Sequence, residues 1–329
     1  MKRLLSCMLI LVLVLGMLSG CGQRAQTPED TETTAGTEPV LEGKAKLQGK
    51  KVIFIGNSFT YYGRCVFEKA QSEYGLEKRV NDMGYFHRIC QENGVEVSVT
   101  NFTFGGHTLK DFYSGDCQAD RGHNGLNHLD YLTDRNYDYV ILQNGSNSAS
   151  APEILDECKP LMELFRKENP NVQFVFLVQH RVHSMPYQWR GSIKGLEEAG
   201  FIVVDWGAVV NDIITGAATV PGATESYDQN SFIISKSESD GFHPNMLTGY
   251  ITALMTYCAI TGEKAEGQVY DFGENDILFG TNALSAFRGK QYTYNRITNF
   301  DKILRTEADM RGIQKLIDQY LAEKAYRNY

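Results

Sequence analysis

Short runs of consecutive apolar residues recur along the chain from about residue 50 onward. They are rich in valine, isoleucine and phenylalanine, and they lie at residues 51–55, 95–103, 139–143, 172–178 and 201–206. Apolar runs of this kind are typical of strands that are covered on both faces. We therefore predict five strands in a sheet that is covered on both faces.

Segments with apolar residues at helical spacing separate or follow these runs, most clearly at 154–169, 245–262 and 300–326. In the second segment the apolar positions form one stripe, and Asn245 and Gly262 can cap its two ends. Strands that alternate with helices imply a parallel sheet with right-handed crossovers and helices on both faces. The predicted fold class is α/β: a three-layer α/β/α sandwich around a mostly parallel, five-stranded, flavodoxin-like sheet.

The first twenty residues have the pattern of a secretion signal. Lys2 and Arg3 precede an apolar run from Leu4 to Leu18, which is short for a membrane span. The following "LSGC" resembles the bacterial lipobox, and that resemblance implies a diacylglycerol on Cys21, which becomes the mature N-terminus. The expected location is outside the cytoplasm, lipid-anchored at the bacterial cell membrane. An ordinary cleaved signal or a short anchor is the alternative.

The rest of the chain divides into a tether and one domain. Residues 21–48 are rich in Thr, Glu, Gly and Pro and nearly free of large apolar residues before Val40, so we predict a flexible tether. Residues 49–329 are expected to form a single domain with a C-terminal helix. Its parts with little periodicity, near 209–239 and 263–299, are predicted insertions.

Composition and charge narrow the class of protein. The chain has 329 residues, 42% hydrophobic and 22% charged, which is typical of a folded domain. Its formal net charge is −8 and it has no Lys/Arg cluster, which argues against nucleic acid or an anionic membrane surface as a partner.

The cysteines outside the signal and the lipobox do not form a recognisable framework. They are odd in number and widely spaced, so neither a disulfide scaffold nor a zinc finger is indicated, and at most two bridges can form. They are Cys65, Cys90, Cys117, Cys158 and Cys258.

Polar residues follow the first three predicted strands directly. Ser58 comes after the first strand, Gly105 and Gly106 after the second, and residues 144–147 after the third. Ligands of an open parallel sheet bind beyond the carboxyl ends of the strands, so these residues are expected at one edge.

A possible base stands late in the chain, in "SDGFHPN" at 239–245. A serine hydroxyl needs a base to take its proton, and the base needs a group to orient it. A turn at Asp240 can fold its carboxylate onto one nitrogen of His243, and Pro244 favours an extended backbone at that histidine. The other nitrogen would then face Ser58.

The chain resembles the SGNH (GDSL-like) hydrolases, and within them a branch of exported bacterial proteins, over about residues 50–262. The matching blocks, in order, are "GNSF" (56–59), "NFTFGGHT" (101–108), "NGSN" (144–147) and "DGFH" (240–243).

The resemblance implies a role for each matched residue. Ser58 would be the nucleophile, His243 the general base and Asp240 its orienting acid. The Ser58 and Gly106 backbone N–H groups and the Asn147 side chain would form the oxyanion hole.

Two departures from the family pattern stand out. Asn57 replaces the usual aspartate of the first block, and the third block lacks the usual aspartate after Asn147. The position of the oxyanion amide therefore stays open, with Gln143 and Asn144 as alternatives to Asn147.

Other candidate residues have weaker patterns. Asn57, His107 and His180 are candidates for substrate contact. His180 and His183 lie three apart without an accompanying carboxylate cluster, so no metal site is predicted. No phosphate-binding glycine loop is present, so no cofactor is expected. Trp189 and Trp206 can stack on sugar rings, although such aromatics are more often core residues.

The sequence thus predicts an exported serine ester hydrolase that uses an acyl-enzyme and removes acyl or acetyl groups from extracellular carbohydrate. Its partners would be a small-molecule or glycan ester, and a membrane only through the lipid. The alternative is a non-catalytic surface lipoprotein that binds glycan or peptide on an SGNH-like scaffold. An ordinary α/β-hydrolase fits less well, because Thr60 stands where G-x-S-x-G needs its second glycine.

Overall fold

The computed structural model describes the chain in segments. These are residues 41–66, 84–114, 132, 134–144, 151–179, 195–224, 226–233, 243–272 and 306–323. All of them belong to the unit formed by residues 41–329. The predicted signal and Cys21 lie outside the described residues.

Five parallel strands form one sheet in the order β2-β1-β3-β4-β5. They are β1 (Lys50–Gly56), β2 (Val97–Thr103), β3 (Tyr139–Leu142), β4 (Gln173–Leu177) and β5 (Ile202–Val204). Each strand falls within or across one predicted apolar run. The five-stranded sheet is confirmed, and every strand pair in it is parallel.

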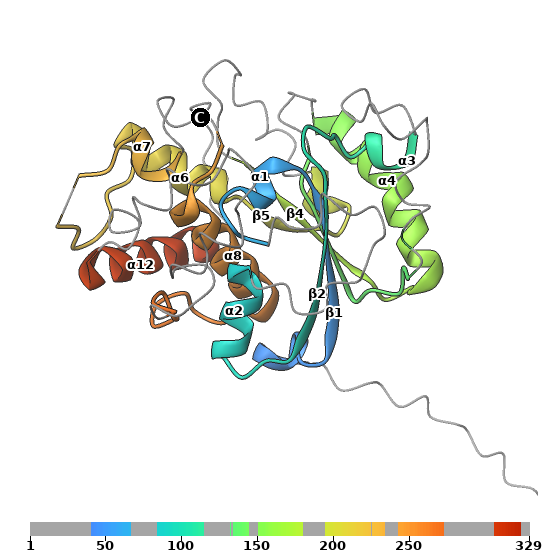
Figure 1. Ribbon diagram of the computed structural model, residues 1–329, viewed down its shortest axis with the longest axis horizontal. Helices are drawn as coiled ribbons and strands as arrows, with labels where there is room; N and C mark the ends of the chain where they lie inside the picture. Colours follow the sequence, from blue (N-terminus) through green and yellow to red (C-terminus); the bar gives the residue numbers. More distant parts are fainter. Residues whose placement is uncertain are drawn as a thin grey trace, which may run out of the picture. The chain divides into compact units, whose positions relative to one another are not determined.

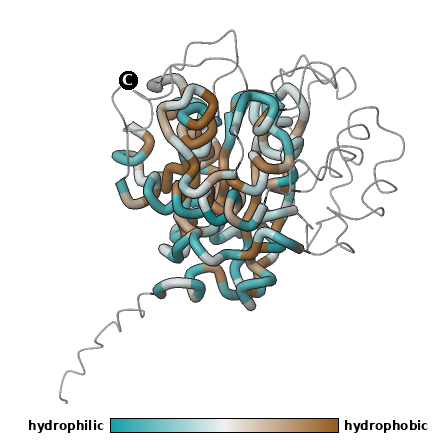
Figure 2. The backbone as a smooth tube through the Cα atoms, turned by 90° about the vertical axis from the view of Figure 1, so that its left-hand side faces the viewer, coloured by the Kyte–Doolittle hydropathy of each residue, from teal (hydrophilic) through white to brown (hydrophobic). Residues whose placement is uncertain are grey.

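Helices cover both faces of the sheet, so the three-layer sandwich is also confirmed (Figure 1). On one face lie α2 (Tyr85–Glu92), α6 (Trp206–Thr215), α8 (Met246–Thr261) and α12 (Glu307–Glu323), and on the other α3 (Asp111–Ser114) and α4 (Ala151–Glu168). Alternate β1 residues serve the two cores: Phe54 packs on the first side, Ile53 and Ile55 on the second. In Figure 2, many of the hydrophobic stretches of the backbone tube (brown) accordingly lie in the interior of the molecule.

Helix α8 is more deeply buried than its single predicted stripe implies. Almost every residue from Met246 to Thr261 is buried, because α2, α6, α12 and β5 all pack against this helix. Its predicted caps are present. The Asn245 side chain accepts the Thr248 N–H at 3.1 Å, and Gly262 ends the helix with φ +79°.

Two predicted irregular regions contain ordered structure. Residues 43–46 form a short 3-10 helix and Leu47 is fully buried, so the flexible tether cannot extend to residue 48. Residues 209–215 belong to α6 rather than to an insertion, because Val209 and Ile213 pack into the core. The predicted C-terminal helix is observed as α12, and residues 273–299 lie outside the described part.

The described part of the chain contains no disulfide, since Cys65, Cys90, Cys158 and Cys258 are all buried thiols. Burial raises the pKa of Cys90, Cys158 and Cys258. In the same part, no helix is long and apolar enough to span a membrane.

Candidate active site

Strand β1 ends in a sharp turn that carries Ser58. Gly56 is the last strand residue, Asn57 caps the next helical turn by accepting the Phe59 N–H at 3.0 Å, and α1 (Ser58–Tyr61) follows at once. A Cβ on Gly56 would lie 2.8 Å from the Thr60 hydroxyl, so only glycine lets α1 close onto the sheet. Ser58 therefore begins α1 at the carboxyl edge.

The imidazole of His243 meets the Ser58 hydroxyl at this edge. The distance from His243 Nε2 to Ser58 Oγ is 2.6 Å, although the residues are 185 positions apart. Both side chains are nearly buried, with 8% of Ser58 and 9% of His243 exposed. In the tautomer protonated at Nδ1, Nε2 accepts the hydroxyl proton, which is the geometry of a nucleophile and its base.

The segment before α8 is held by α7 (Gln229–Phe232). Pro244 pairs with Ile233 in an antiparallel bridge, and the Asn245 backbone N–H donates to the Phe232 carbonyl at 2.9 Å. The Asn245 side chain donates to the Ser231 carbonyl at 2.8 Å. The region predicted as an insertion therefore contains the support of the histidine loop.

Two glycines bring the serine and histidine elements into direct backbone contact. Gly63 follows α1 and Gly249 lies in the first turn of α8. A Cβ on Gly249 would overlap the Gly63 carbonyl, and a Cβ on Gly63 would lie 2.8 Å from Gly249 Cα. The approach of His243 to Ser58 thus depends on a contact that excludes side chains at both positions.

Gln143, just after β3, forms hydrogen bonds that hold the turn carrying Ser58. Its side-chain oxygen accepts the Asn57 N–H and the Thr60 hydroxyl, each at 3.1 Å. Its amide nitrogen donates to Gln179 Oε1 at 2.9 Å and to the Asn144 carbonyl. One buried amide therefore links the ends of β1, β3 and β4.

Asn57 has a supporting role rather than the predicted substrate contact. It is 1% exposed, and its amide nitrogen donates to the carbonyls of His107 at 2.8 Å and Asn144 at 3.4 Å. An aspartate has no such donor, which gives a physical reason for asparagine at this position in this chain.

The two alternative oxyanion amides are also engaged within the protein. Gln143 is 1% exposed and both of its amide groups are used, as described above. Asn144 is 2% exposed and its side-chain oxygen accepts the Leu109 N–H at 3.0 Å. Burial raises the pKa of Glu157, while hydrogen bonds from the Asn144 side chain and the Lys110 backbone lower it. Neither amide is placed to serve an incoming substrate.

Gly106 presents its backbone in an exposed turn after β2. The turn is closed by a 3.4 Å bond from His107 N–H to the Phe104 carbonyl, and Gly106 has φ +74°. Among the described residues, no hydrogen bond is formed by the N–H of Gly106 or by that of Ser58. Within the described part of the chain, both predicted backbone donors are therefore without a protein acceptor.

His107 is buried rather than lining an open pocket. It is 3% exposed, its Nδ1 lies 3.0 Å from the Gly105 carbonyl, and its ring packs against Phe104 and Phe112. Trp206 is a fully buried core residue. Asp240, Asn147, His180, His183 and Trp189 lie outside the described residues, so their predicted roles stay predictions.

Tyr62 is a site residue that the sequence analysis missed. Its ring is stacked on the His243 imidazole, with 4.0 Å between centroids and 9° between planes. Its spacing in the sequence could have identified it, because Tyr62 lies four positions after Ser58 and residues at this spacing share a helix face.

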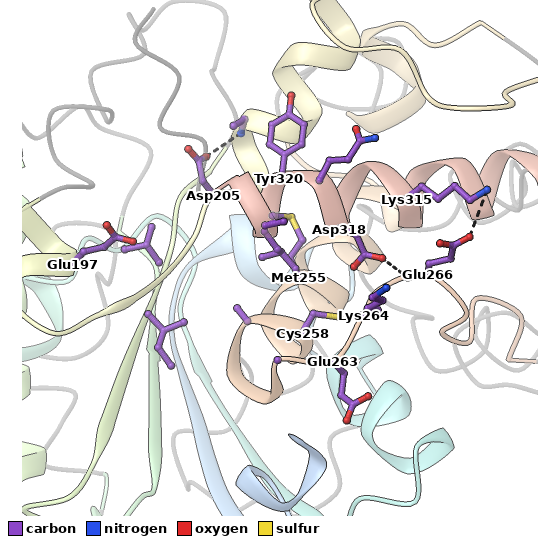
Figure 3. A pocket seen from close by; sticks show the side chains of 18 of the residues that line it. Glu197, Asp205, Met255, Cys258, Glu263, Lys264, Glu266, Lys315, Asp318 and Tyr320 are labelled. Atoms are coloured by element: carbon purple, nitrogen blue, oxygen red, sulfur yellow. Dashed lines mark hydrogen bonds and ion pairs between the residues drawn. The ribbon is translucent and has the colours of Figure 1, made fainter. Parts of the chain in front are cut away.

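A cavity of about 870 Å³ opens between β5, α8 and α12 (Figure 3). Neither Ser58 nor His243 lines it. Much of its polar lining is already paired: Lys315 lies 3.5 Å from Glu266, and Asp318 accepts two backbone N–H groups. Within the described segments, no group of three or more His, Cys, Asp or Glu residues is placed to hold a metal ion.

Comparison with known proteins gives low similarities. No protein-family model and no curated protein matches the chain. An acetylxylan esterase from Geobacillus stearothermophilus is 17% identical, with 66% of this chain and 96% of that chain covered and a TM-score of 0.41. A variant of that enzyme is 19% identical, with 66% of this chain and 96% of that chain covered and a TM-score of 0.42. A candidate GDSL-like lipase from Parabacteroides merdae is 15% identical, with 66% of this chain and 97% of that chain covered and a TM-score of 0.41.

No functional assignment rests on these similarities. The sheet order and the contact between the first and fourth sequence blocks are observed directly. Together they give a five-stranded parallel α/β/α sandwich with a serine and a histidine in contact at the carboxyl edge, which is the arrangement implied by the sequence resemblance.

Proposed function

We propose that this protein is a serine ester hydrolase in which Ser58 and His243 act as nucleophile and general base. The observation that carries the proposal is the 2.6 Å contact between His243 Nε2 and Ser58 Oγ at the carboxyl edge of the sheet. A serine hydroxyl becomes nucleophilic when an adjacent base removes its proton as it attacks.

The proposed reaction has two steps. Ser58 Oγ attacks the ester carbonyl while Nε2 of His243 takes the proton, and the same proton is then passed to the departing alcohol. Water, deprotonated by His243, attacks the acyl-serine and releases the carboxylic acid and free Ser58.

The negative oxygen formed in each step needs fixed donors. The N–H groups of Ser58 and Gly106 are the proposed donors, and neither forms a hydrogen bond within the described part of the chain. A fixed donor of this kind contributes about 3 kcal/mol to lowering the barrier. Asn147 is the proposed third donor, because Gln143 and Asn144 are committed elsewhere.

The orienting acid is proposed to be Asp240, on the basis of its spacing from His243 and of the family resemblance. A turn there would place a carboxylate next to the second imidazole nitrogen and so fix the tautomer that the reaction requires.

The location and the substrate class are proposals from the sequence. A charged and apolar N-terminus followed by "LSGC" supports export and a lipid on Cys21. An esterase held outside the cell would meet acylated carbohydrate, so acetyl or other acyl groups on glycans are the proposed substrate. A change of Cys21→Ser should release the protein from the membrane fraction.

Labelling with a fluorophosphonate tests the proposal directly. We expect wild-type protein to be modified at Ser58 and to hydrolyse a short-chain aryl ester, and Ser58→Ala to lose both properties while remaining folded. The matched control is Ser98→Ala, a half-buried serine on β2, which should keep labelling and activity.

Two results would contradict the proposal. One is undiminished labelling or hydrolysis in Ser58→Ala. The other is a folded wild-type protein that is never labelled but binds glycan or peptide, which would favour the binding lipoprotein. If the wild type is active, a panel of acetylated glycans identifies the substrate.

A further inference from the structure

The His243 imidazole is enclosed by aromatic side chains of the serine element. The Tyr62 ring lies parallel to it, 4.0 Å away and tilted by only 9°. The Phe59 ring lies at 5.3 Å with a tilt of 42°. The imidazole therefore meets the flat face of Tyr62, while its Nε2 meets the Ser58 hydroxyl.

Tyr62 and Ser58 are rigidly connected. The Tyr62 backbone N–H donates to the Ser58 carbonyl at 3.0 Å and closes the turn of α1. Side chains four positions apart on a helical turn lie on the same face. The nucleophile and the stacked ring thus approach the imidazole as one unit.

Three uncharged side chains contact the imidazole, namely those of Ser58, Phe59 and Tyr62. Asp240, the predicted charged partner, lies outside the described residues. The ring is also largely removed from water, with 9% of His243 exposed. A cation formed here depends strongly on its neighbours, because bulk solvent screens it little.

We propose that Tyr62 is a positioning residue for His243: its ring holds Nε2 in line with the Ser58 hydroxyl and stabilises the imidazolium that forms when the proton moves. The face of an aromatic ring carries negative potential and attracts a cation within about 6 Å. This inference rests on the proposed function, since the imidazolium appears in that reaction.

The simpler interpretation is that Tyr62 only fills space beside the histidine. The two interpretations differ in one measurable property. A space-filling ring affects stability alone, whereas a ring that positions the imidazole and stabilises the imidazolium also affects kcat in a protein that stays folded.

Hydrolysis of a short-chain aryl ester is the first measurement, in wild type, Tyr62→Leu and Tyr62→Phe. In Tyr62→Leu we expect kcat to fall about 3- to 30-fold, with KM changed less than about twofold. Tyr62→Phe keeps the aromatic face and should stay within about twofold of wild type. Ile251→Val, in the core of α8, controls for mild destabilisation and should leave kcat unchanged.

Proton NMR of the imidazole N–H is the second measurement, with the His243 signal assigned by its absence in His243→Gln. We expect the signal to be kept in Tyr62→Phe and to broaden or disappear through exchange with water in Tyr62→Leu, because the ring is no longer held in place. This measurement does not depend on activity, so it separates this inference from the proposed function: an inactive wild type would contradict the esterase, but the comparison of N–H signals would still test Tyr62. If Tyr62→Leu does not fold, Tyr62→Gln provides the same test at this half-buried position. An unchanged His243 N–H signal in the folded variant would overturn the proposal.

Discussion

The two halves of the candidate site are held in different ways. Ser58 sits on a turn fixed by hydrogen bonds from buried amides, chiefly those of Asn57 and Gln143. His243 sits on a loop fixed by backbone contacts, through the Ile233–Pro244 bridge and the approach of Gly63 to Gly249.

The difference shows where each half is vulnerable. A hydrogen-bond network fails when one partner is removed and the others stay buried without bonds. A backbone contact fails when any side chain is added, because the packed elements have no room to move. The following substitutions test this comparison, from the largest expected effect to the smallest.

Gly249→Ala should be the most damaging single change. The new Cβ would overlap the Gly63 carbonyl, and both groups are backbone. We expect a loss of about 3 kcal/mol or more in the free energy of unfolding, together with loss of hydrolysis, because α8 must shift away from α1. Urea unfolding and ester hydrolysis measure the two effects.

The control for this change is Gly195→Ala. Its Cβ would meet nothing within 4 Å, and its residue is helical, so a neutral or slightly stabilising effect is expected. If Gly249→Ala were as harmless as this control, the glycine contact would not join the two halves.

Gln143→Leu should be the next most damaging. It removes the acceptor for the Asn57 N–H and the Thr60 hydroxyl and the donor to Gln179. We expect a loss of about 2–3 kcal/mol in stability and at least a tenfold fall in kcat, since Ser58 loses its support. Gln173→Ala, an exposed glutamine at the start of β4, should change neither quantity. A Gln143 variant with full activity would show that Ser58 is placed by packing alone.

Asn57→Asp tests the departure from the family pattern. A carboxylate there would face the His107 and Asn144 carbonyls that now accept hydrogen bonds. We expect destabilisation of about 1–3 kcal/mol, although the cap on Phe59 is kept. Thermal unfolding at neutral pH measures the change, and an equally stable variant would contradict this role of the amide.

Substitution of His87 should produce the smallest effect, which is visible only in how the stability of the fold depends on pH. Burial, and secondarily the charge of Arg88, lower the pKa of His87, and within the described part of the chain its Nδ1 has no hydrogen-bond partner. The unfolded chain then binds the proton more readily, so this contribution to stability is complete above about pH 6.5 and is lost as pH falls towards the lowered value.

The measurement for His87 is the difference in melting temperature between wild type and His87→Gln from pH 7.5 to 5. The wild type should lose more stability than the variant over this range. Parallel curves would mean that the buried imidazole does not contribute to acid sensitivity.

Much of the fold followed from the sequence because its signals are local. The five apolar runs became the five strands, and Asn245 and Gly262 cap α8 as predicted. Errors arose where packing overrides composition. Leu47 anchors the end of the predicted tether, and α6 continues through residues with little periodicity.

The site was only partly predictable. The pairing of Ser58 with His243 followed from their places relative to the strands and from the family resemblance. The supporting role of Asn57, the commitment of Gln143 and Asn144, and the stacked Tyr62 did not, since each depends on partners from several strands.

The sequence by itself determined which segments become strands and helices, and that a serine and a histidine are available at one sheet edge. Those properties depend on spacing along the chain, which is visible without coordinates. Only the tertiary structure decided which amides are used up inside the protein and that Gly63 meets Gly249. Contacts between residues far apart in the chain are set by how the layers pack, because packing rather than local preference determines which groups remain for a substrate.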